Sequence, residues 1–308
     1  MSYQNRCRFT AVALSATALA ATIALAPVAS GDPATTGPAV GTYVALGDSF
    51  AAGPGMPPFD NENCERSQHN YGHLVARALG VARYTDVTCG GAVTESLSTA
   101  QKTGVAPQLD SVSPDTDLIT VTLGGNDAGF IEVLTTCGVL GLASVVPDPC
   151  RTYYTRTGVD ELARRLTEDV APKLQAAFDA IRARAPHAVI IATTYPHIFP
   201  ESGQCWPAIP FAAGDMPWLA AVQRSLNAMI AAAATRADAL VADVFANSAE
   251  HNACQPAEVR WVEPLNGAVA APAHPNHTGM AEIAAAVLST ARSAGLDSAY
   301  PHPSAPVR

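Results

Sequence analysis

The run from Asp117 to Leu123 restricts the fold of this chain more than any other stretch. The six residues after Asp117 are all leucine or β-branched, a composition typical of a strand that is covered on both faces. Such strands belong to parallel sheets with helices on either side. The run ends abruptly at Gly124-Gly125-Asn126-Asp127, which predicts a tight turn at the carboxyl end of the strand.

Four further short apolar runs predict strands, and stretches with helical spacing separate them. The other strands are expected at 42–47, 83–88, 187–194 and 239–244, and helices at 71–80, 160–185, 217–236 and 278–294. Pro172 is expected to kink or divide the second of these helices. The alternation predicts one α/β domain with a five-stranded parallel sheet covered by helices on both faces.

The N-terminus has the organisation of a secretory signal peptide. Arg6 and Arg8 precede an uncharged run, Phe9–Ala26, and small residues follow near Ser30. An uncleaved membrane anchor is the competing interpretation, but the run is rich in Ala, Ser and Thr and is marginal for the roughly 20 strongly apolar residues of a span. We expect a signal peptide at 1–30, a linker at 31–40, the folded domain at 41–296 and a tail at 297–308.

Composition restricts the partners. The 308-residue chain carries a formal net charge of -9 and only two lysines, Lys102 and Lys173. This balance disfavours nucleic acid and anionic lipid as partners. We expect a secreted monomer that has no stable membrane anchor once the signal peptide is removed.

Cysteine usage agrees with export. Of seven cysteines, Cys7 lies in the predicted signal peptide, which leaves Cys64, Cys89, Cys137, Cys150, Cys205 and Cys254. An even number in an exported protein indicates disulfides, although the sequence itself leaves 15 pairings open. Cys-x-x-Cys motifs and paired Cys/His spacings are absent from the sequence, so we expect neither a metal nor another cofactor.

Candidate catalytic residues follow the predicted strands. Ser49 ends the first strand in Gly-Asp-Ser, Gly91 follows the second, Asn126 follows the third, and His274 lies in a late loop. Gly-Asp-Ser by itself is also ordinary turn chemistry. Together, however, these residues supply a hydroxyl nucleophile, a base to activate it, and donors for an oxyanion. That set is what acyl transfer requires.

In these four blocks the sequence resembles the SGNH (GDSL-type) hydrolases. The resemblance spans residues 43–280 and implies a flavodoxin-like three-layer α/β/α sandwich. It implies that Ser49 is the nucleophile, that His274 is the base, and that Ser49, Gly91 and Asn126 form the oxyanion hole. It also implies consecutive disulfides, namely Cys64–Cys89, Cys137–Cys150 and Cys205–Cys254.

Two positions depart from the family pattern. Phe50 replaces the usual leucine after the serine, a change expected to affect packing behind the nucleophile. Ala271 stands where many members have an aspartate three residues before the histidine. We therefore expect the main-chain carbonyl of Ala271 to orient His274, with Glu263 as the outside candidate for that role.

The sequence favours a secreted serine esterase or lipase acting on a lipid or an acylated small molecule. Apolar residues expected to suit an acyl chain are Phe59, Val139, Leu140, Trp206, Phe211 and Trp218. One alternative is a polysaccharide O-acetylesterase, in which the aromatic residues would bind sugar. The other is an inactive secreted binding protein, which all four intact signature residues disfavour.

Overall fold

The structure is a computed structural model that describes residues 40–267 and 269–296. The predicted signal peptide, residues 31–39 of the predicted linker and the predicted tail lie outside the described residues. Val40, the last residue of that linker, is fully buried and its carbonyl accepts a hydrogen bond from Ala82. The packed part of the chain therefore includes at least one residue before position 41.

The described residues contain a five-stranded parallel sheet, as predicted. Its strands are β1 (Thr42–Gly47), β4 (Arg83–Asp86), β5 (Leu118–Thr122), β6 (Val189–Thr193) and β7 (Leu240–Ala242). Their spatial order is β4-β1-β5-β6-β7, which is the 2-1-3-4-5 order of flavodoxin-like sheets. All the strands are parallel, but successive strands are added on one side of β1 and then on the other, so β1 and β5 flank the position in the sheet where ligands usually bind.

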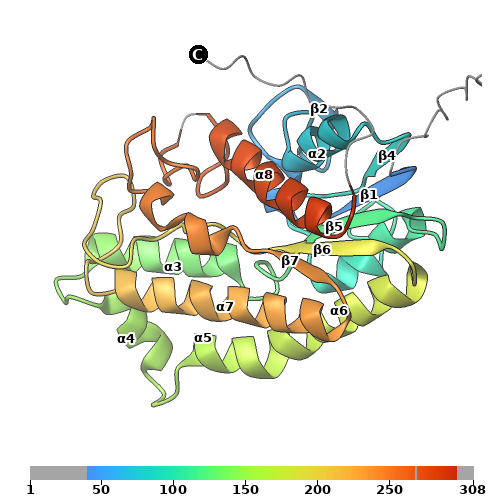
Figure 1. The fold of residues 1–308 in the computed structure, drawn as a ribbon. Helices are drawn as coiled ribbons and strands as arrows, with labels where there is room; N and C mark the ends of the chain where they lie inside the picture. The colour runs from blue at the N-terminus through green and yellow to red at the C-terminus, as the bar shows by residue number, and fades with distance from the viewer. Residues whose placement is uncertain (1–39, 268, 297–308) are drawn as a thin grey trace, which may run out of the picture. The chain divides into compact units, whose positions relative to one another are not determined.

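Helices cover both faces of this sheet (Figure 1). The helices α2 (Tyr71–Leu79) and α8 (His277–Ser293) lie on one face, and α6 (Ala171–Arg184) and α7 (Met216–Arg236) on the other. The residues of β1 alternate between the two cores, because Val44 and Leu46 pack on one side while Tyr43 and Ala45 pack on the other. The three-layer α/β/α prediction is confirmed.

The helix predicted around Pro172 is continuous but not uniform. It consists of α5 (Glu161–Arg164), a π-helical turn η3 (Arg165–Val170) and α6. Pro172 is the second residue of α6, directly after the π turn. Because proline has no N–H to donate, the regular α-helical ladder cannot continue through it unchanged.

The sequence did not predict several shorter elements. They are α1 (Ser49–Ala52), the hairpin β2 (Phe59–Asn61) and β3 (Arg66–Ser67), α3 (Phe130–Ala143), α4 (Pro149–Thr155), and 3₁₀ turns at Thr94–Leu97, Gln108–Ser111, Phe245–Asn247 and Ala249–His251. The helix α3 is apolar nearly all round and contains two glycines, so it shows little helical periodicity. Among the described residues, we find no helix with the length and apolar composition of a membrane span.

Candidate active site

Ser49 lies where β1 passes directly into α1. Gly47 has a φ of 147°, and a Cβ at this position would lie 2.7 Å from the Thr122 carbonyl oxygen, so only glycine fits. Asp48 caps α1 by accepting a hydrogen bond of 2.9 Å from the Phe50 N–H. This sharp strand-to-helix turn leaves Ser49 as the first residue of the helix at the carboxyl edge of the sheet.

The structure brings His274 to Ser49 across 225 residues of sequence. The Ser49 hydroxyl lies 2.7 Å from Nε2 of His274, and Nδ1 of the same ring lies 2.7 Å from the Pro272 carbonyl oxygen. A carbonyl only accepts, so Nδ1 carries the proton and Nε2 is left to accept from the serine. This is the tautomer that a general base requires.

The prediction that the Ala271 carbonyl orients His274 is wrong by one residue. The Ala271 carbonyl instead accepts the His274 main-chain N–H at 3.1 Å and closes a β-turn. In that turn Pro272 is the second residue and Ala273, with a φ of 59°, is the third, as in a type II turn. The carbonyl of Pro272 takes no part in closing the turn, so it is the one available to the imidazole.

Glu263 braces the histidine loop. Its main-chain N–H donates to the His274 carbonyl at 2.9 Å, and its carbonyl accepts from Ala273 at 3.0 Å. Its buried carboxylate pairs with Arg260 at 2.8 Å and accepts from the Asn276 amide at 3.0 Å. Asn276 in turn caps α8, so this ion pair ties the histidine loop to the start of that helix.

Asn126 and the Gly91 loop are joined to each other. The side-chain amide of Asn126 donates one N–H to the Ala92 carbonyl at 2.9 Å, which leaves its second N–H for another acceptor. Gly91 has a φ of 78° and is the third residue of a turn closed by Ala92 and Cys89. This hydrogen bond therefore joins the two loops that carry the predicted oxyanion donors.

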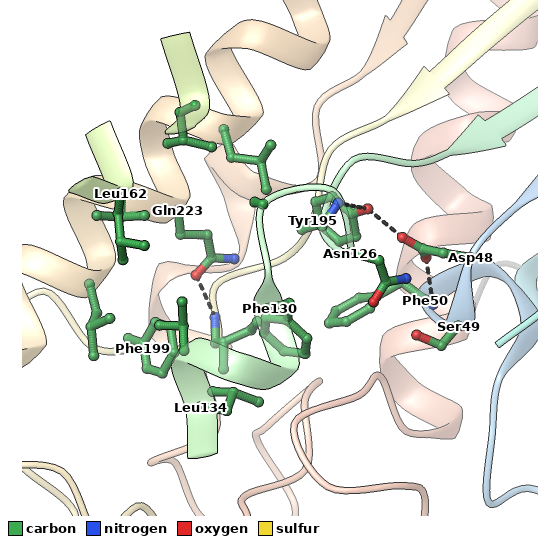
Figure 2. Close-up of a pocket in the computed structure, with 18 residues that line it drawn as sticks. Asp48, Ser49, Phe50, Asn126, Phe130, Leu134, Leu162, Tyr195, Phe199 and Gln223 are labelled. Carbon is green, nitrogen blue, oxygen red and sulfur yellow. Dashed lines mark hydrogen bonds between the residues drawn. The ribbon is translucent and has the colours of Figure 1, made fainter. Parts of the chain in front are cut away.

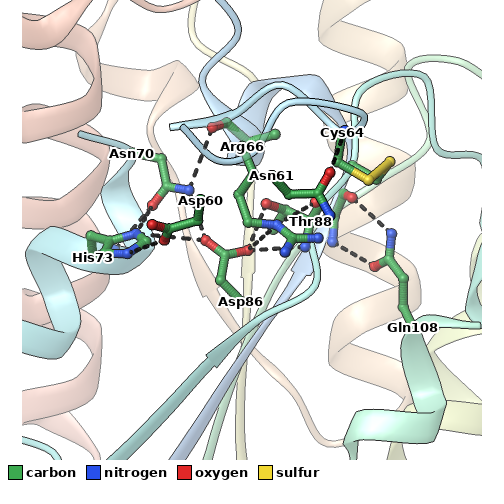
Figure 3. Close-up of polar contacts among 12 residues, drawn as sticks. Asp60, Asn61, Cys64, Arg66, Asn70, His73, Asp86, Thr88 and Gln108 are labelled. Atoms are coloured by element: carbon green, nitrogen blue, oxygen red, sulfur yellow. Dashed lines mark hydrogen bonds and ion pairs between the residues drawn. A yellow bond between two sulfur atoms is a disulfide. The ribbon is translucent and has the colours of Figure 1, made fainter. Parts of the chain in front are cut away.

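A polar brace around Thr88 and the Cys64–Cys89 disulfide holds the segment that leads into Gly91 (Figure 3). The disulfide Cys64–Cys89 and a 2.8 Å hydrogen bond from Arg66 to the Thr88 carbonyl tie the β2–β3 hairpin to the end of β4. On the other side, the Gln108 side chain accepts from the Gly47 N–H at 2.8 Å and donates to the Gly47 carbonyl at 2.9 Å. The Cys89 N–H donates to the Gly47 carbonyl at 3.0 Å, so the serine turn and the segment before Gly91 are joined.

The other two disulfides are Cys137–Cys150 and Cys205–Cys254. The structure thus pairs consecutive cysteines, as the family resemblance implies. Cys137–Cys150 joins α3 to α4, and Cys205–Cys254 joins the loop after β6 to the loop after β7.

Tyr195, which the sequence did not single out, links the serine turn to the Asn126 loop. Its hydroxyl donates to the Asp48 carboxylate at 2.5 Å and accepts from the Gly125 N–H at 2.8 Å. Burial raises the pKa of Asp48 to about 7, against the lowering effect of its hydrogen bond from Tyr195. Burial also raises the pKa of Tyr195 well above its usual value, so its hydroxyl keeps its proton.

Burial also affects the protonation of His274, whose exposed fraction is 7%. Because a buried cation loses its hydration, burial lowers the pKa of the His274 ring, and the Pro272 carbonyl offsets part of this effect. The Phe50 ring stands 4.9 Å from the imidazole ring, centroid to centroid. Phe50 therefore covers the base as well as packing behind the nucleophile.

An apolar pocket extends inward from Ser49 (Figure 2). Ser49 and Asn126 lie at one end, while Leu134, Leu162 and Phe199 lie at the other. The free volume is about 70 Å³, several times the roughly 10–15 Å³ that a cavity needs to hold one water molecule.

The helices α1, α3, α5 and α7, the π turn η3 and the loops after β5 and β6 supply the walls of this pocket. The residues that the sequence suggested for an acyl chain do not line it. Phe211 is buried in the core, whereas Trp206 and Val139 are more than half exposed. Periodicity cannot show which apolar residues face a cavity, since pocket walls and ordinary core have the same composition. Within residues 40–267 and 269–296, we find no group of three or more His, Cys, Asp or Glu side chains placed to hold a metal ion.

Comparison with known proteins agrees with this geometry. The chain matches the profile of the GDSL-like lipase/acylhydrolase family over residues 45–282. It is 43% identical over 249 residues to Lipase 2 of Streptomyces coelicolor, covering 79% of this chain and 83% of that protein. It is 30% identical over 252 residues to a lipase of Streptomyces rimosus, with coverages of 81% and 86%.

Solved structures of two Streptomyces enzymes resemble the fold of this chain. Phospholipase A1 from Streptomyces albidoflavus superposes with a TM-score of 0.69 at 26% identity, covering 82% of this chain and 99% of that one. The extracellular lipase of Streptomyces rimosus also gives 0.69, at 28% identity and with coverages of 81% and 99%. The chain therefore belongs to the GDSL-like lipase/acylhydrolase family and is a carboxylic ester hydrolase.

Proposed function

We propose that this protein hydrolyses fatty acyl esters through an acyl-enzyme formed on Ser49. The observation that carries the proposal is the chain of contacts from the Ser49 hydroxyl through His274 to the Pro272 carbonyl, each of 2.7 Å. These contacts lie at the mouth of a pocket with apolar walls. A hydroxyl, a base in the correct tautomer and an apolar site are the parts that acyl transfer from a lipid-like ester needs.

In the first half-reaction, Nε2 of His274 takes the hydroxyl proton as Ser49 Oγ attacks the ester carbonyl carbon. The carbonyl oxygen gains the negative charge of the tetrahedral intermediate. The N–H groups of Ser49 and Gly91 and the free N–H of the Asn126 amide stabilise this charge. His274 then gives its proton to the departing alkoxide, so an alcohol leaves and Ser49 carries the acyl group.

In the second half-reaction, a water molecule takes the place of the alcohol. His274 removes its proton, the oxygen attacks the acyl carbon, and the acid leaves as Ser49 recovers its proton. The imidazolium formed in each step is stabilised by the neutral carbonyl of Pro272, since no carboxylate stands at position 271. The catalytic pair is therefore a Ser-His dyad that the main chain orients.

The pocket favours an acyl chain over an acetyl group. Its lining reaches Leu162 on α5 and Leu226 on α7, well beyond the space that a single methyl group fills. This lining disfavours the polysaccharide O-acetylesterase alternative.

We also propose that the protein is secreted as a monomer. The signal-like N-terminus, three disulfides and an extracellular relative with 28% identity support export.

The test is an acyl-chain profile measured with Val222→Phe. Val222 is partly exposed and lines the pocket, so a larger ring can shorten the pocket without overfilling the core. We expect the wild type to prefer nitrophenyl decanoate to nitrophenyl acetate. The variant should lose roughly tenfold in kcat/KM on the decanoate while retaining acetate turnover.

The matched control is Val259→Phe, at an exposed position that is not part of the pocket lining. It should leave both rates unchanged. A wild-type preference for acetate, together with release of acetate from acetylated xylan, would support the acetylesterase instead.

A further inference from the structure

The helix α3 and the loop after it expose an unusual number of large apolar side chains. They are Ile131, Val139, Leu142, Val145 and Val146, and Val145 is completely exposed. We call these five residues the α3 apolar face. Isolated exposed apolar residues are ordinary, but a group on neighbouring positions commonly marks an interaction site.

Helix geometry places the exposed residues of α3 together. At 100° per residue, Ile131, Val139 and Leu142 fall within about 80° of one another on a single side of the helix. Val133 and Leu134, on the inner side, line the pocket that begins at Ser49. One helix therefore contributes both a wall of the pocket and the apolar outer face.

The charges around this face restrict its partner. From residue 131 to residue 147 the sequence contains no lysine or arginine, and its one acid is Glu132. Arg165 pairs with that carboxylate at 3.1 Å. A segment without lysine or arginine on an acidic protein gains little from anionic lipid headgroups. It can still gain from burying apolar side chains in a lipid surface of zero net charge.

We infer that the α3 apolar face docks on aggregates of uncharged or zwitterionic lipid. Docking would hold the helix that forms one wall of the pocket at the surface that contains the substrate. The disulfide Cys137–Cys150 ties the middle of α3 to α4 and closes the segment that carries Val139, Leu142 and Val145. The purpose of docking rests on the proposed function, but the docking itself does not require turnover.

The experiment measures binding without catalysis. Ser49→Ala protein is mixed with dioleoyl phosphatidylcholine vesicles, and the bound fraction is measured by flotation. On this background we compare Val139→Ser/Val145→Ser with Val259→Ser/Val269→Ser, which changes two exposed valines outside α3 and its loop. The first pair should weaken vesicle partitioning by roughly tenfold or more, because it removes two apolar side chains from the docked surface. The second pair should not.

A second measurement uses active protein. The Val139→Ser/Val145→Ser change should reduce hydrolysis of vesicular phosphatidylcholine while leaving hydrolysis of dissolved nitrophenyl acetate unchanged. Equal partitioning of the two paired variants would overturn the inference. So would binding that needs phosphatidylglycerol and is lost in salt. A wild-type dimer that the α3 pair dissociates in sedimentation would assign the face to a second copy of the chain instead. Active protein that floats normally with the vesicles but hydrolyses neither vesicular phosphatidylcholine nor nitrophenyl acetate would count against the proposed function alone.

Discussion

At the scale of single residues, the oxyanion role proposed for Asn126 gives the sharpest prediction. One of its amide hydrogens is held by the Ala92 carbonyl at 2.9 Å, so the amide is oriented before any substrate arrives. Because the second hydrogen meets a charge that exists only during reaction, Asn126→Ala should reduce kcat by about 10² to 10³ and change KM little. Steady-state kinetics on a soluble ester gives both constants. A rise in KM at constant kcat would instead make Asn126 a substrate-binding residue.

His274 gives a pH prediction at the same scale. Burial lowers its pKa, and the base must be neutral to accept the serine proton, so the acid limb of kcat/KM should lie below the usual histidine value of about 6.5. Ala271→Asp would add a carboxylate next to the turn that carries His274. A nearby negative charge favours the imidazolium, so the acid limb should move up by about one unit with a modest change in rate. An acid-limb pKa that is the same in Ala271→Asp and in the wild type would show that position 271 is too far from the ring to affect the pKa of His274.

At the scale of elements, the brace behind the Gly91 loop should affect rate as well as stability. Opening Cys64–Cys89 with a double alanine variant releases a loop with a sequence separation of 25 residues, and opening Cys205–Cys254 releases one of 49. In the chain-entropy model each loss costs about 3 to 4 kcal/mol of unfolding free energy.

Of these two disulfides, only Cys64–Cys89 adjoins Gly91, a proposed oxyanion donor. The Cys64–Cys89 variant should therefore also lose kcat, whereas the Cys205–Cys254 variant should keep it at temperatures where both remain folded. Denaturant unfolding and kinetics on the same samples separate the two effects. Equal losses of kcat would mean that the brace acts only through global stability.

At the scale of the whole molecule, Asp48 couples stability to pH. Its folded pKa of about 7 lies above the unfolded value near 3.8, so its contribution to stability is fully present below pH 3.8 and is lost as the pH rises through 7. The difference in unfolding free energy between wild type and Asp48→Asn should therefore change by up to about 4 kcal/mol between pH 4 and pH 8. Chemical denaturation across this range measures it. A difference that is independent of pH would mean that Asp48 stays ionised when buried.

The fold as a whole also shows which features the sequence could predict. Buried parallel strands have a distinct composition, and chemistry gathers at their carboxyl ends, so the sheet and the turns that carry Ser49, Gly91 and Asn126 could be predicted from the residues. His274 lies in a late loop, and the family resemblance singled it out. Tyr195 and Gln108 could not, because their partners Asp48 and Gly47 lie 147 and 61 residues away. The helix α3 was missed because an apolar helix lacks the polar side that produces periodicity.

The most direct test of the whole account is the structure of the protein after reaction with a decyl phosphonate ester. The account predicts phosphorus bonded to Ser49 Oγ and a phosphoryl oxygen facing the N–H groups of Ser49, Gly91 and Asn126. It also predicts that the decyl chain lies in the pocket toward Leu134 and Leu162. Phosphorus bonded to another residue, or an alkyl chain directed away from this pocket, would contradict it.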